Sequence, residues 1–89
     1  MGHIAKDKQN QGRLNRVIGQ LQSIKNMMDN EDDCHKIIQQ MSAAKGALNS
    51  LIQRYLEGHI EEHVVNETND NQRQKAGEEL VSMVRSYFK

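Results

Sequence analysis

Residues 34–65, CHKIIQQMSAAKGALNSLIQRYLEGHIEEHVV, decide the fold of this chain. The segment contains no proline, and its apolar residues recur at the three- and four-residue spacing of an amphipathic helix. Gly46 and Gly58 weaken such a helix by about 1 kcal/mol each, and Gly58 could end it early. We predict one long helix over these residues, with a buried side made of Ile37, Ile38, Met41, Ala44, Leu48, Leu51, Ile52, Tyr55, Leu56 and Ile60.

Three residues of this predicted helix are candidate metal ligands. His59 and His63 are four positions apart, so they project from one helix face and could both bind a single metal ion. Cys34 lies about 25 residues earlier, which is roughly 37 Å along an unbroken helix. One subunit therefore cannot bring the thiol to the imidazoles, whereas two antiparallel helices can. The small residues at 43–47 (AAKGA) would let the two helices cross closely, which predicts a dimer with two metal sites at the ends of its interface.

The sequence on either side predicts two further helices. Apolar residues at 14–28 repeat with helical spacing, and the polar stretch 29–33 ends that pattern, with acids able to cap the next helix. A second polar stretch, 66–71, precedes a last amphipathic helix at roughly 72–88. We therefore expect an all-α subunit of three helices, without strands or internal repeats.

Composition bounds the class of protein. We expect a chain of 89 residues to form one small domain, 1–89, with residues 1–8 as a flexible N-terminal arm. Only 36% of its residues are hydrophobic, so we expect much of its stability to come from packing against copies of itself. The single cysteine, Cys34, cannot form an internal disulfide and suits a reducing compartment. No apolar run approaches the ~20 residues of a membrane span, so we expect a cytoplasmic protein with no membrane partner.

The charges of the chain sum to zero but are unevenly distributed. Residues 1–28 contain five basic residues and one acid, whereas the acids gather at 29–33 and again at 57–70. Such a basic segment would suit a surface that faces nucleic-acid phosphates. Charge alone slightly favours the other interpretation, an ordinary solvated helix face.

Several short motifs of this chain occur together in one known family. They are RLNRVIGQL at 13–21, Cys34, Gln39-Gln40, AAKGAL at 43–48, the pair His59-xxx-His63 and the C-terminal SYFK at 86–89. In this combination the chain resembles the CsoR/RcnR/FrmR family of bacterial repressors over nearly its whole length. The resemblance implies three-helix subunits whose antiparallel dimer forms a four-helix bundle, with dimers pairing into a homotetramer. It also implies metal ligands drawn from two subunits and no helix-turn-helix.

The same resemblance implies a partner, double-stranded operator DNA. Arg13 and Arg16 fall where the family contacts phosphates and grooves, and Lys8 precedes them by about a turn and a half of helix. Lys45 stands where the resembling repressors have arginine, and a lysine there gives up bidentate contacts. Four copies of this sparse patch in a tetramer would make a broad basic surface.

The candidate metal ligands of this chain indicate which effector it binds. Copper(I) sensors of the family carry a second cysteine where this chain has His63, whereas its nickel/cobalt sensors carry histidines matching His3, His59 and His63 together with Cys34. One sulfur with several imidazoles suits Ni(II) or Co(II), and Zn(II) is possible. The amine of Gly2 could add a further nitrogen. We therefore predict Ni(II) or Co(II) as the effector. Glu79 would either hydrogen-bond a ligating histidine or simply face solvent.

Three alternative functions would use parts of the same sequence. A formaldehyde-responsive repressor of the same fold would use Cys34 and the N-terminal amine, although the formaldehyde sensors carry an acidic residue at the position of His63. A metal-binding helical bundle without DNA binding would share the ligands but not the basic patch. Residues 59–63 also match the H-x-x-E-H pattern of zinc proteases, but so short a chain cannot build a substrate cleft around it. The sequence therefore favours a repressor that binds its operator without metal and releases it with metal, derepressing metal efflux.

Overall fold

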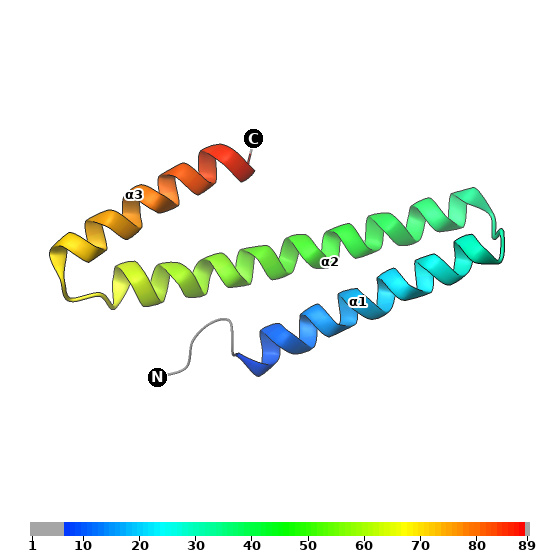
Figure 1. Ribbon diagram of the computed structural model, residues 1–89, viewed down its shortest axis with the longest axis horizontal. Helices are drawn as coiled ribbons and strands as arrows, with labels where there is room; N and C mark the ends of the chain where they lie inside the picture. Colours follow the sequence, from blue (N-terminus) through cyan, green and yellow to red (C-terminus); the bar gives the residue numbers. More distant parts are fainter. Residues whose placement is uncertain (1–6, 89) are drawn as a thin grey trace. The chain divides into compact units, whose positions relative to one another are not determined.

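The computed structural model describes residues 7–88. Over these residues the chain forms α1 (Lys8–Asp29), α2 (Cys34–Ile60), the π-helix η2 (Glu61–Val65) and α3 (Asp70–Tyr87), and no strand (Figure 1). The all-α prediction is therefore confirmed. The chain divides into two compact units, Met1–Tyr55 and Leu56–Lys89. No helix in the described part is long and apolar enough to cross a membrane.

The first unit contains α1 and most of α2, which run antiparallel beside each other (Figure 1). Asp7 caps α1 by accepting a hydrogen bond from the Gln9 amide at 2.8 Å. At the other end, Glu31 takes a positive φ of 55°, and the two amides that follow Asn30 bond back to carbonyls of the last helical turn. This is a Schellman turn, formed here without glycine. Asp33 then caps α2 by accepting from the His35 amide at 3.4 Å.

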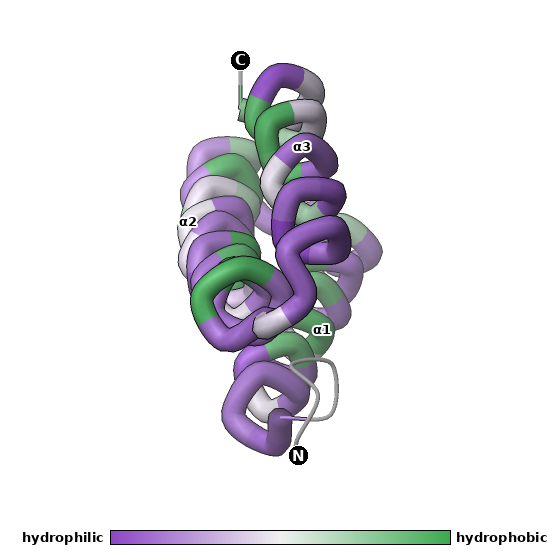
Figure 2. The backbone as a smooth tube through the Cα atoms, turned by 90° about the vertical axis from the view of Figure 1, so that its left-hand side faces the viewer, coloured by the Kyte–Doolittle hydropathy of each residue, from purple (hydrophilic) through white to green (hydrophobic). Residues whose placement is uncertain are grey.

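A single chain covers only part of the α2 face that the sequence predicts to be buried. Hydrophobic and hydrophilic positions alternate around each helix in Figure 2. The buried residues of α2 are only Ala44 and Leu51, and those of α1 are only Val17 and Ile24. Two helices can cover only a narrow stripe of each other, so the rest of each apolar face remains in water. The large side chains left more than 40% exposed in this unit are Leu14, Ile18, Leu21, Met28, Ile38, Met41, Leu48, Ile52 and Tyr55.

The second unit contains the last turn of α2, η2 and α3. Gly58 does not end the helix, which stays helical through the predicted limit at Val65, but its last five residues form a π-helix. α3 contacts η2 and begins at Asp70, two residues earlier than predicted, because the Asn69 side chain caps it by accepting from the Gln72 amide at 3.0 Å. Ala76 is the buried residue of α3.

Candidate metal centre

His59 and His63 are the two predicted metal ligands that lie in the second unit. His59 lies in the last turn of α2 and His63 in η2, and the two ring centroids are 4.7 Å apart with an angle of 49° between the ring planes. With metal–nitrogen bonds of about 2.1 Å, two imidazoles on neighbouring positions of one ion have centroids roughly 4.5 to 5.5 Å apart. The observed spacing is therefore compatible with binding of one ion by both rings.

The Nε2 atom of His59 is buried and has no hydrogen-bond partner among the described residues. A buried polar atom without a protein partner is costly, and in native proteins an ordered water, an ion or another ligand can complete its bonding. A neutral imidazole nitrogen is a common ligand of borderline divalent metals. The histidine pair therefore fits a Ni(II), Co(II) or Zn(II) ion.

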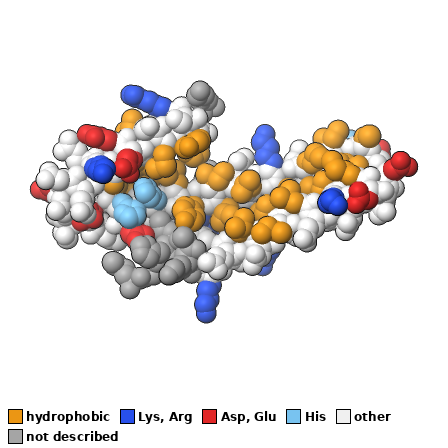
Figure 3. All heavy atoms as spheres, in the orientation of Figure 1, with side chains coloured by type: hydrophobic (Ala, Val, Ile, Leu, Met, Phe, Trp, Pro, Cys, Tyr) orange, Lys and Arg blue, Asp and Glu red, His pale blue; other side chains and the backbone are white. Residues whose placement is uncertain are grey.

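A pocket of about 450 Å³ lies beside this pair. Glu67, in the turn between η2 and α3, contributes to its wall. The remaining wall comes from α3, where residues at helical spacing share one face: Gln72, Lys75, Ala76 and Glu79. On the face drawn in Figure 3, histidine atoms cluster close to acidic side chains. The predicted Glu79 thus lines the pocket while remaining exposed to solvent.

The other pocket residues were not predicted from the sequence. The spacing of α3 groups Gln72, Lys75 and Ala76 with Glu79, and that pattern could have identified them once Glu79 was singled out. Glu67 lies outside any helix, so no periodicity could have placed it in the pocket.

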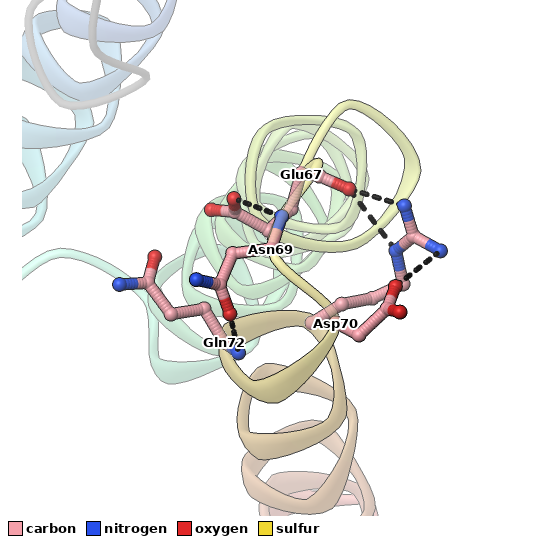
Figure 4. A network of polar contacts seen from close by, with 5 residues as sticks. Glu67, Asn69, Asp70 and Gln72 are labelled. Atoms are coloured by element: carbon pink, nitrogen blue, oxygen red, sulfur yellow. Dashed lines mark hydrogen bonds and ion pairs between the residues drawn. The ribbon is translucent and has the colours of Figure 1, made fainter.

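The turn that carries Glu67 is held by a polar network (Figure 4). The Glu67 carboxylate accepts a hydrogen bond from the Asn69 amide at 3.0 Å, and the Glu67 carbonyl accepts from the Arg73 guanidinium through Nε at 3.1 Å and also through Nη2. Arg73 also lies 3.8 Å from the Asp70 carboxylate. These contacts fix both the backbone and the side chain of Glu67 at the edge of the pocket.

The structure does not bring the predicted thiol ligand to the histidines. Cys34 is a free, exposed cysteine at the first position of α2 and belongs to the first unit, whereas His59 and His63 belong to the second. Among residues 7–88, no group of three or more His, Cys, Asp or Glu side chains is placed to hold an ion. The predicted ligand His3 lies outside the described residues.

The four predicted DNA-contacting residues all belong to the first unit. Lys8 begins α1, Arg13 is half-buried and Arg16 is exposed along the same helix, and Lys45 is exposed on α2. In the described part of the chain the observed ion pairs involve other residues, Lys25 with Asp29 and Arg73 with Asp70. None of the four predicted residues takes part in these two ion pairs.

Comparison with known proteins agrees with this fold. Residues 6–86 match the family model described as metal-sensitive transcriptional repressor. The RcnR transcriptional repressor of Citrobacter koseri is 32% identical and that of Salmonella typhimurium 31% identical, each over the full length of both chains. A solved structure of a glutamate-to-histidine variant of the formaldehyde-responsive regulator FrmR, from Salmonella enterica serovar Typhimurium, is also similar. It is 31% identical, covers 90% of this chain and 91% of its own, and has a TM-score of 0.82.

This chain belongs to the metal-sensitive transcriptional repressor family. Its relatives are transcriptional repressors and not enzymes, which confirms that the H-x-x-E-H match in residues 59–63 is incidental.

Proposed function

We propose that this chain is a cytoplasmic repressor released from its operator by Ni(II) or Co(II). Without metal it binds double-stranded operator DNA and blocks transcription of a metal-efflux function. When metal is available, His59 and His63 bind it together with Cys34 of a second chain and with His3. Zn(II) suits the same donors and remains a candidate effector.

The observation that carries this proposal is the buried, unpartnered Nε2 of His59 beside the His63 ring. Two imidazoles supply a borderline donor set, which a single thiolate does not make soft enough to favour copper(I). The full-length similarity to proteins named RcnR supports the nickel/cobalt assignment further.

The proposed assembly is an antiparallel homodimer that pairs into a homotetramer. The exposed apolar side chains of α1 and α2 need a partner surface, because single soluble chains rarely leave so large a hydrophobic patch in water (Figure 3). Within one chain, Cys34 belongs to the first unit and both histidines belong to the second. A head-to-tail partner would bring its own Cys34 toward His59 and His63.

The proposed DNA surface consists of Lys8, Arg13, Arg16 and Lys45, repeated by the assembly. These side chains would bind phosphates, so operator affinity should fall steeply as salt rises. If the protein shows no salt-dependent DNA binding, the alternative of a metal-binding helical bundle without a regulatory role is favoured instead.

A formaldehyde-responsive repressor is the second candidate. The exposed Cys34 is accessible to an electrophile, and a chain similar in structure is named a formaldehyde-responsive regulator. The two candidates differ at His63, which a metal site uses and a covalent site at Cys34 does not.

A DNA-release titration distinguishes these functions. Operator-bound protein is titrated separately with Co(II), Ni(II), Zn(II), Cu(I) and formaldehyde, for the wild type and for Cys34→Ala and His63→Ala. We expect both variants to keep operator binding and to lose release by Co(II) and Ni(II). Release by formaldehyde that survives in His63→Ala, without any response to metal in the wild type, would assign the second function.

A further inference from the structure

Lys75 and Glu67 are oppositely charged residues of the histidine pocket, and the proposed metal site uses neither as a ligand. Lys75 is exposed on α3, and within residues 7–88 its ammonium group forms no ion pair. Glu67 is half-buried at the pocket edge. We propose that these two charges set the sensitivity of the site, Lys75 lowering and Glu67 raising its affinity for a divalent cation. This inference rests on the metal-sensing function proposed above.

The fixed position of Glu67 argues for an effect through charge and not through coordination. Its Oε1 atom already accepts the Asn69 amide hydrogen at 3.0 Å, and Arg73 holds the backbone carbonyl of the same residue. In the described part of the chain, Glu67 does not form a ligating group of three with His59 and His63. A carboxylate held beside the site still contributes an attractive potential to any cation that enters the pocket.

Lys75 acts in the opposite direction for the same reason. A divalent ion at the histidine pair would meet the positive charge of Lys75 across the pocket, and the repulsion is proportional to the charge of the ion. The pocket wall also includes exposed groups, so water and salt weaken the interaction. We therefore expect each charge to change the affinity for a divalent cation by about threefold to tenfold, and not by the larger factors of a lost ligand.

The test is a Co(II) titration of the full-length assembled protein, followed by the absorption of the bound ion. Lys75→Gln and Glu67→Gln remove one charge each, and glutamine at position 67 keeps an oxygen that can accept the Asn69 amide hydrogen. Lys25→Gln and Glu78→Gln are matched controls, because they make the same charge changes outside the pocket. Each protein is titrated at about 0.05 M and at about 0.5 M salt. The higher concentration shortens the screening length roughly threefold.

We expect Lys75→Gln to bind Co(II) about threefold to tenfold more tightly and Glu67→Gln to bind it more weakly by a similar factor. Both shifts should shrink at high salt, and the controls should match the wild type. Unchanged or weaker binding by Lys75→Gln would overturn the proposal, as would control variants that shift equally. A loss above about 100-fold in Glu67→Gln with an altered Co(II) spectrum would make Glu67 a ligand and overturn its assigned role.

His63→Ala separates this inference from the proposed function. If His63→Ala loses Co(II) binding while Lys75→Gln and Glu67→Gln behave like the wild type, only the charge-tuning inference fails. If His63→Ala binds Co(II) as the wild type does, the metal site itself is wrongly placed.

Discussion

The exposed apolar face of α2 leads to a quantitative prediction about assembly. Leu48 is 42% exposed in the single chain, so a partner that covers it would remove roughly 75 Å² of apolar surface from water, worth about 2 kcal/mol. A two-fold interface contains the residue twice, which doubles the contribution to about 4 kcal/mol. We therefore expect Leu48→Asp to raise the dimer dissociation constant by about 1,000-fold or more.

Sedimentation over a range of protein concentrations measures this effect. Gln53→Asp is the matched control, because it introduces the same negative charge on the same helix at an exposed polar position about 140° further around. The control should assemble as the wild type does, and circular dichroism should report helical chains in all three proteins. If Leu48→Asp and the wild type sediment identically across all concentrations, this face is not the interface and the antiparallel dimer is refuted.

Three further substitutions test separate parts of the molecule. Arg16→Gln should weaken operator binding and lower the slope of log affinity against log salt by about one for each copy that contacts a phosphate; an unchanged slope would remove Arg16 from the DNA surface. Gly46→Ala should stabilise the helix of a single chain by up to about 1 kcal/mol, because an added Cβ meets nothing within 4 Å. If two helices cross at Gly46, the same substitution should weaken the dimer by tenfold or more, because the added methyl group would separate them. Gly19→Ala, equally unobstructed within its chain, is its control in unfolding and sedimentation, and a Gly46→Ala dimer as tight as the wild type would contradict a crossing at this position. Arg73→Lys should lower the free energy of unfolding by about 1 kcal/mol, because lysine keeps the charge but not the two hydrogen bonds that the guanidinium donates to the Glu67 carbonyl. An unchanged denaturation midpoint would show that these hydrogen bonds are not stabilising.

The helices of this chain were predictable because their signals are local. The polar stretch at 29–33 ends α1 and starts α2 through side-chain and backbone contacts only a few residues apart, and Asp33 caps α2 as its position suggests. The π-helix was not predictable, since the spacing of His59 and His63 is the same in the sequence whether the backbone winds as α or π.

Burial was the part of the fold that the sequence described least accurately. Apolar periodicity identifies which side of a helix avoids water, but not which molecule covers it. Leu48 and Ile52 have the same pattern as Ala44 and Leu51, yet the first two remain exposed and the second two are buried. The periodicity therefore predicted a face wider than a single neighbouring helix can cover.

The proposed site also separates two properties of a metal sensor. Bound metal would connect Cys34, the first residue of one α2, to the histidines at the end of the α2 of another chain. This connection would favour one relative position, or register, of the two chains. Arg13 and Arg16 would move with that register because α1 joins α2 through a short turn. The extent of DNA release then depends only on the difference in metal affinity between the two registers, and 1–3 kcal/mol gives a change of about 5- to 150-fold. Lys75 and Glu67 lie beside the histidines of a single unit, so their charges act on bound metal in either register. Substituting them should therefore shift the metal concentration at which release occurs while leaving the maximal release unchanged.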